Sequence, residues 1–167
     1  MVGKTTLLER EIAINQYQLE MFRKIANDLG DASLFDRTPG HGHPPAWILG
    51  HLAICAELGQ RHQGGSITHP DWVARFGTGS SDVITPEPTL TVTVLSGAII
   101  EEYRKLQSLA LSQSDDFLLR DHGVAGLAGT PIETVADAIA TLFTNHFGFH
   151  LSQLSACRRT AGHTPIH

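Results

Sequence analysis

The chain has 167 residues, of which 41% are hydrophobic and 17% charged, and its formal net charge is −5 at pH 7. This length fits one domain over residues 1–167, because a chain of this size buries on the order of 70% of its unfolded surface. Acidic residues are scattered, and the longest basic run is the pair Arg158–Arg159. The composition therefore argues against nucleic acid and membrane surfaces as partners.

The cysteines and the apolar segments indicate a compartment. Cys55 and Cys157 are far apart and belong to no C-x-x-C pattern, which argues against a disulfide framework. Charged residues interrupt the N-terminal apolar stretch before a secretory signal forms, and no apolar run reaches the roughly 18 residues of a membrane span. The sequence therefore predicts a cytoplasmic protein.

The first half of the chain predicts two helices. Apolar positions spaced by three and four residues predict an amphipathic helix over about 5–29, with Asn15 as the polar position on its apolar seam. Gly30 follows as a residue suited to a left-handed helix end. Pro44 and Pro45 begin a second helix over 45–62, which the pair of glycines at 64 and 65 ends.

The second half predicts two more helices. Residues 64–88 are rich in glycine and proline and predict a loop of about 25 residues, which in a compact domain is functional or mobile. A third helix is predicted over 90–111. Thr130 and Glu133 suggest a capping box that opens a fourth helix over 131–159.

Four helices, each with one apolar face, hide those faces best against one another. The sequence therefore predicts an all-α fold, a four-helix bundle. The loop between the second and third helices is long enough to cross the bundle, so the topology need not be up-down-up-down.

Three histidines are the main clue to function. His146 and His150 are four residues apart on the fourth predicted helix, which places both rings on one face, and His51 lies on the inward face of the second helix. Together they can hold one divalent ion and leave a coordination position for water or substrate. The alternative is that each imidazole is satisfied by a backbone carbonyl or a hydroxyl, without any metal.

Several residues near the three histidines bear on what this site can do. Phe147 stands where a zinc protease has its glutamate base, so the catalytic residues stay unknown. Cys55 follows His51 by one turn and is a fourth ligand, a reactive thiol or, as favoured here, a buried apolar residue. Gln153 can orient a histidine or a ligand. Asn15 faces the same pocket or, as favoured, sets helix register. Four further histidines lie in or beside predicted loops and are expected on the solvated surface: His43, His62, His69 and His122.

The sequence resembles the DinB-like superfamily of bacterial four-helix bundles, which is related to YfiT-like metal-dependent hydrolases. The resemblance rests on the W-x-x-x-H-L pattern ending in His51-Leu52, and on the H-x-x-x-H-x-x-Q-L pattern from His146 to Leu154, followed by Arg158–Arg159. It covers nearly the whole chain through short motifs. Many members have Glu where Phe147 stands, which puts a base or supporting role at that position in doubt.

The resemblance implies that His51, His146 and His150 bind one divalent ion, which is zinc, nickel, iron or manganese, and that the protein is a homodimer. It also implies a small-molecule substrate and, in some relatives, a low-molecular-weight thiol as cofactor. The first hypothesis is thus a metal-dependent hydrolase or thiol transferase. The second is a metal-binding bundle without chemistry, acting as a sensor, scavenger or dimerisation module. The third is a helical interaction module that binds no metal.

Overall fold

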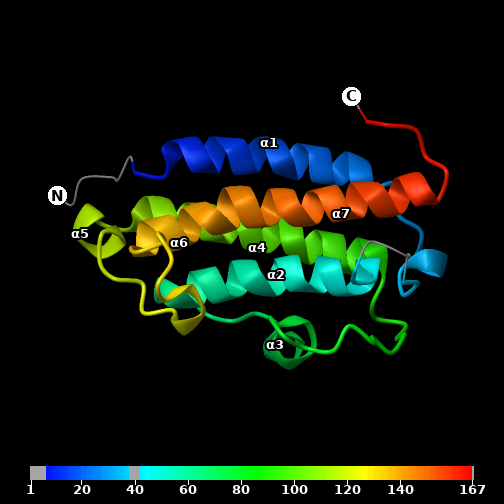
Figure 1. The fold of residues 1–167 in the computed structure, drawn as a ribbon, viewed down its shortest axis with the longest axis horizontal. Helices are drawn as coiled ribbons and strands as arrows, with labels where there is room; N and C mark the ends of the chain where they lie inside the picture. Colours follow the sequence, from blue (N-terminus) through cyan, green and yellow to red (C-terminus); the bar gives the residue numbers. More distant parts are fainter. Residues whose placement is uncertain (1–6, 38–41, 167) are drawn as a thin grey trace.

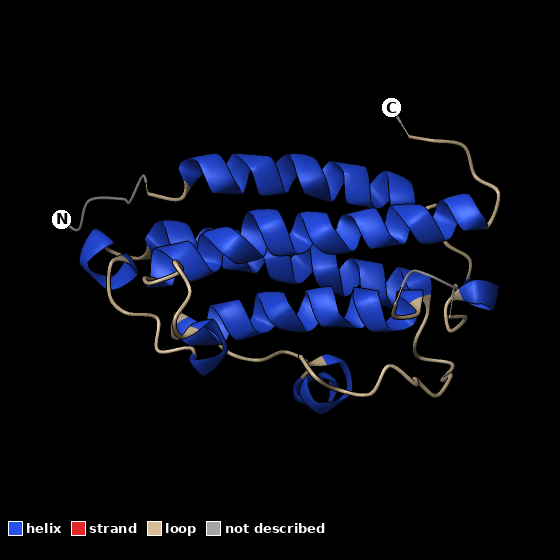
Figure 2. Cartoon of the chain, in the orientation of Figure 1, coloured by secondary structure: helices blue, strands red, loops and turns tan. Residues whose placement is uncertain are grey.

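The computed structural model describes residues 7–37 and 42–166, and all regular structure in these ranges is helical (Figure 2). The chain is all-α, as predicted. The predicted start of the first helix near residue 5 lies outside the described residues. The α-helices are α1 Glu9–Ala26, α2 Pro45–His62, α3 Pro70–Phe76, α4 Val92–Ser112, α5 Asp115–Leu118, α6 Val135–Thr141 and α7 Phe147–Thr160. A π-helical segment, Leu142–His146, joins α6 to α7.

The long helices lie side by side (Figure 1). Helix α1 packs on α4 and α7, and α2 packs on the same two helices from the other side. Helix α3 lies outside this group, against α2. As a result α2 is buried around nearly its whole circumference, including every residue from Pro45 to Glu57. The expectation that each helix buries one face only is therefore wrong for α2, because α3 covers the face that the long helices leave open.

The end of α1 differs from the prediction. The helix stops at Ala26, and Gly30 is extended (φ −101°, ψ 143°) rather than left-handed. The chain leaves the helix through turn bonds from Asp28 N to Ile25 O and from Leu29 N to Ala26 O, both 3.1 Å. The Asp28 carboxylate here accepts hydrogen bonds from the buried Arg158 guanidinium. Helix α1 thus ends three residues before the predicted position, and Asp28, just beyond the end, pairs with Arg158 of α7.

Helix α2 begins and ends where predicted. Pro45 occupies its first position, where the missing amide proton costs nothing. Gly64 adopts φ +86°, the amide of Gly64 bonds Arg61 O at 3.0 Å, and the amide of Gly65 bonds Gln60 O at 2.8 Å. These are the two hydrogen bonds of a Schellman motif.

The predicted loop over 64–88 contains a helix, α3. Pro70 begins it, and Trp72, Val73 and Phe76 pack against the core. The seven residues of α3 are too few to show a helical repeat of apolar positions, so the sequence did not distinguish this segment from a loop. Phe76 is fully buried, which shows that tertiary contact holds this short helix.

The two later helices begin with side-chain caps. The Thr91 hydroxyl accepts the Val94 amide at 3.2 Å and opens α4. The predicted capping box at Thr130 and Glu133 is wrong: the box is formed four residues later by Thr134 and Asp137. The chain before it is held by an isolated antiparallel bridge between Asp121 and Thr134, so helical geometry starts only after this bridge.

The π-helical segment is supported by side chains from neighbouring helices. Asn15 is fully buried, donates from its Nδ2 to the Phe143 carbonyl at 3.0 Å and accepts from Gln107 Nε2 at 2.7 Å. Gln18 Nε2 donates to the Thr144 carbonyl at 3.2 Å. A π-helical turn weakens the regular backbone ladder, and these donors satisfy carbonyls inside it. The turn ends at His146 and so sets the rotation of α7, which carries His150.

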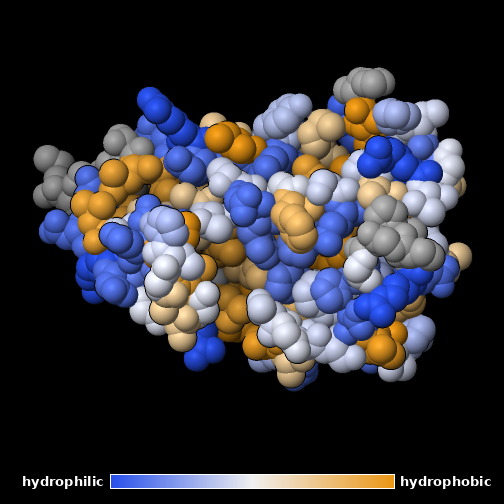
Figure 3. Space-filling view, viewed as in Figure 1, coloured by the Kyte–Doolittle hydropathy of each residue, from blue (hydrophilic) through white to orange (hydrophobic). Residues whose placement is uncertain are grey.

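The surface shown in Figure 3 mixes hydrophilic residues with scattered hydrophobic ones. Among the described residues, the large apolar side chains with the greatest exposure are Val83, Tyr17, Leu119 and Phe149. None of the helices in the described part of the chain combines the length and the apolar composition needed to cross a bilayer.

The Asn15 contacts predict a large stability effect. Replacing Asn15 by alanine leaves the Phe143 carbonyl and the Gln107 amide buried without this partner, so the free energy of unfolding should fall by about 2–4 kcal/mol. Urea denaturation monitored by circular dichroism measures the change. The matched control is Ile14→Ala on the same helix, where the side chain is 48% exposed and the expected change is within about 1 kcal/mol. Equal losses in the two variants would contradict the structural role of Asn15.

Candidate metal centre

The three predicted histidines come together between α2 and the chain around α7. The ring centroids of His51 and His146 are 5.1 Å apart, those of His51 and His150 are 5.0 Å apart, and those of His146 and His150 are 4.7 Å apart. His51 and His150 are buried and His146 is partly buried. Residues almost one hundred positions apart thus form one compact imidazole cluster.

The ring of His51 is oriented by helix α3. Its Nδ1 lies 2.7 Å from the carbonyl oxygen of Phe76. A carbonyl only accepts hydrogen bonds, so Nδ1 carries the proton and the lone pair of His51 is on Nε2. This is the arrangement that holds metal-binding histidines in one tautomer.

The ring of His150 is oriented in the same way by its own helix. Its Nδ1 lies 2.7 Å from Oε1 of Gln153, one turn further along α7. When Nδ1 donates this bond, the lone pair of His150 is also on Nε2. Gln153 therefore contacts the site through a histidine.

His146 faces His51 directly. The two Nε2 atoms are 3.1 Å apart, and the buried Nδ1 of His146 has no hydrogen-bond partner. Two nitrogens that bind one ion at about 2.0–2.1 Å in tetrahedral geometry are roughly 3.3 Å apart. The spacing of these two nitrogens fits shared coordination, and the donor set fits a divalent transition metal ion.

Cys55 belongs to a group of donor atoms that could hold a metal ion. Its Sγ lies 3.5 Å from Nε2 of His51, and donor atoms of His51, Cys55 and His146 all lie within 4.8 Å of one another. His150 faces this group ring to ring but is not part of it. Asn15 makes its hydrogen bonds with Phe143 and Gln107 rather than with a histidine.

Burial keeps the histidines neutral. Burial, together with a smaller effect of the neighbouring imidazoles, lowers the pKa of His146 to about 3 and that of His150 to about 4. The pKa of His51 is also lowered, mainly by burial. Burial raises the pKa of the Cys55 thiol to about 12. At neutral pH the imidazoles can therefore bind a cation without losing protons, whereas Cys55 would have to lose one.

A stack of aromatic rings leads outward from His51. The indole of Trp47 stacks on His51 at a centroid distance of 4.4 Å. The ring of His43 also stacks on Trp47, at a centroid distance of 3.8 Å. Nδ1 of His43 lies 3.3 Å from the Asp82 carboxylate, an electrostatic contact without hydrogen-bond alignment. His43 was expected on the solvated surface, and the structure instead places it two rings from a candidate ligand.

Two other loop histidines also differ from that expectation. His122 is buried, donates from Nε2 to the Ile132 carbonyl at 2.8 Å and accepts the Val124 amide at 2.7 Å. His69 belongs with the fully buried Glu57 and Glu102 to a second group whose donor atoms lie within 4.8 Å of one another. Sequence reasoning missed these residues. The one available signal was Glu57, an acidic residue that follows an apolar run in the second helix.

The lowered pKa values predict a pH-dependent stability for the metal-free protein. Both folded-state values lie below the 6.5 of the unfolded chain, so unfolding takes up protons between these values and stability rises with pH. The stabilising contribution is complete above pH 6.5 and is lost as the pH falls toward 4. From pH 7 to pH 5 the free energy of unfolding should fall by about 1–2 kcal/mol per histidine.

Urea denaturation at both pH values measures this loss. The control is the His146→Gln, His150→Gln double variant, in which the loss should be smaller by the combined contribution of the two histidines. An unchanged pH dependence in that variant would show that other groups account for the loss.

Comparisons of the chain with models of protein families, with curated proteins and with solved structures found no match.

Proposed function

We propose that the protein is a metal-dependent enzyme of the DinB-like type, a four-helix bundle that holds one divalent ion through His51, His146 and His150. One observation carries the proposal. The Phe76 carbonyl and Gln153 Oε1 accept hydrogen bonds from Nδ1 of His51 and Nδ1 of His150, which leaves the lone pair of each ring on Nε2. Nε2 of His51 lies 3.1 Å from Nε2 of His146, a spacing that suits two nitrogens on one transition metal ion.

The reaction class follows from the donor set. An ion held by three neutral imidazoles supplies Lewis acidity and lowers the pKa of a coordinated water or thiol. The protein orients the ligand rings through Phe76 and Gln153 and keeps them neutral by burial. The proposed activity is hydrolysis, or transfer of a low-molecular-weight thiol to a small electrophile. The proposal includes the homodimer that the resemblance implies.

Elemental analysis tests this proposal. Protein purified without an affinity tag or chelator should contain about one transition metal ion per chain, and the His146→Ala, His150→Ala double variant should contain none. Hydrolase and thiol-transfer activity against small electrophiles should disappear in the same variant.

The matched control is His122→Ala, which removes a buried histidine outside the cluster. This variant should keep its metal. Absence of metal from the wild type, even after incubation with zinc or nickel, would leave the third hypothesis, a helical interaction module with self-satisfied histidines.

A second candidate function is a closed metal centre without catalysis, as in a sensor or scavenger. The position of Cys55 favours it, because its Sγ lies 3.5 Å from Nε2 of His51. Catalytic zinc sites keep an open coordination position, whereas structural sites are closed by a fourth protein ligand.

Cobalt substitution separates the two candidates. If Cys55 is a ligand, the cobalt protein has a thiolate-to-cobalt charge-transfer band in the near ultraviolet, and Cys55→Ser removes it. Cobalt affinity should then also rise with pH, since binding displaces the thiol proton. If the open site is correct, Cys55→Ser leaves the spectrum and the metal content unchanged.

A further inference from the structure

Helix α3 is attached to α2 at both of its ends. At the start of α3, Oε2 of Glu57 accepts the backbone amides of Thr68 and His69, each at 2.8 Å, and Oε1 accepts Nδ1 of His69 at 2.5 Å. At the end of α3, the Phe76 carbonyl accepts Nδ1 of His51 at 2.7 Å. Glu57 and His51 lie less than two turns apart on α2. Hydrogen bonds therefore join α2 to the chain at the start of α3 and at its end.

Aromatic rings connect the two ends within α3. The His69 ring stacks on Trp72 at a centroid distance of 4.3 Å, and Trp72 meets Phe76 edge to face at 5.6 Å. Phe76 packs on the backbone of Gly50, where a Cβ atom would lie 2.4 Å from its ring. Phe76 thus packs directly against Gly50, the residue that precedes His51. Any side chain at position 50 would displace the Phe76 ring.

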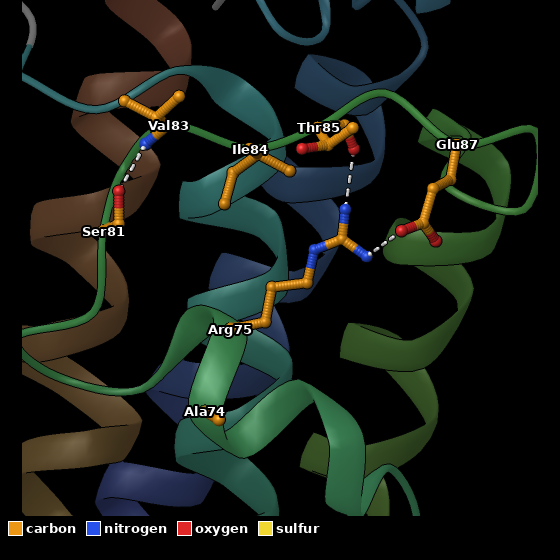
Figure 4. A pocket seen from close by; sticks show the side chains of 7 residues that line it. All are labelled: Ala74, Arg75, Ser81, Val83, Ile84, Thr85 and Glu87. Atoms are coloured by element: carbon orange, nitrogen blue, oxygen red, sulfur yellow. Dashed lines mark hydrogen bonds and ion pairs between the residues drawn. The ribbon is translucent and has the colours of Figure 1, made fainter.

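Helix α3 is also attached on its outer side. Figure 4 shows Arg75 reaching from α3 to the segment that follows, where it donates to the Thr85 carbonyl at 2.7 Å and to the Glu87 carboxylate at 3.0 Å. None of the candidate ligands lines the groove drawn there. Helix α3 is therefore held by contacts at its start, at its end and on its outer side.

The chemistry of Glu57 suits this anchoring role. It is fully buried, and three donors converge on its two oxygens. An ionised carboxylate accepts all three. An amide of the same size accepts through one oxygen only and turns an NH₂ group toward the remaining donors, so it cannot replace the carboxylate.

We propose that Glu57 is a positioning residue for His51: by holding Thr68 and His69, the two residues immediately before α3, it keeps the Phe76 carbonyl on Nδ1 of His51 and the lone pair on Nε2. The ligand role of His51 rests on the proposed function. The tautomer of His51 does not, because the hydrogen bond to Phe76 exists without a metal.

The test is Glu57→Gln with two measurements. In the metal-free protein, nitrogen-15 NMR of the imidazoles should show His51 with its proton on Nδ1 in the wild type and a mixture of tautomers in the variant. Zinc affinity, measured by competition with a chelator, should fall about 10- to 100-fold, as for the loss of other groups that orient a metal ligand.

Two further variants keep the test decisive. Asp28→Asn breaks the ion pair with the buried Arg158, away from α3, and should leave the tautomer and the zinc affinity unchanged. If Glu57→Gln does not fold, Glu57→Asp, which keeps the charge but shortens the side chain, should show a smaller shift of both quantities. A folded Glu57 variant with the wild-type tautomer and a zinc affinity within about twofold of wild type would overturn the proposal. A wild type that binds no zinc would overturn the proposed function, while the tautomer measurement would still test Glu57.

Discussion

The burial of three imidazoles is the constraint on which the rest of the structure depends. A polar ring nitrogen in the core costs free energy unless it is paired, so the chain must bring a partner to each ring or leave the nitrogen for a cation. Helix α3 brings the Phe76 carbonyl to His51, and α7 brings Gln153 to His150. Nδ1 of His146 stays unpaired. A backbone carbonyl at the end of the seven-residue helix α3 thus meets the polar demand of His51.

The irregular backbone before α7 serves the same cluster. A π-helical turn changes the rotation of the residues that follow it, and this one ends at His146. Its carbonyls are met by Asn15 and Gln18 from α1. A polar residue on an apolar helix face, which in isolation looks like a packing defect, is therefore the partner that permits the irregular turn.

Some features of fold and site were predictable from sequence because their causes are local. Pro45 and the glycines after residue 62 bound α2 by backbone geometry alone, and His146 and His150 share a face because helical spacing puts them there. Helix α3 was not predictable, because seven residues carry too little periodicity and its stability comes from Phe76 in the core. The start of α6 was misplaced because the bridge between Asp121 and Thr134 is a contact between distant residues.

The sequence by itself determined the all-helical class and the candidate histidines, because periodicity and residue type are written in consecutive positions. Only the tertiary structure decided how those histidines are oriented, that Cys55 lies among their donor atoms, and that Glu57 and His69 hold α3 in place. These relations join residues through space, and a backbone carbonyl such as that of Phe76 has no sequence signature. Orientation of a buried ring depends on which acceptor reaches it, and that is set by packing.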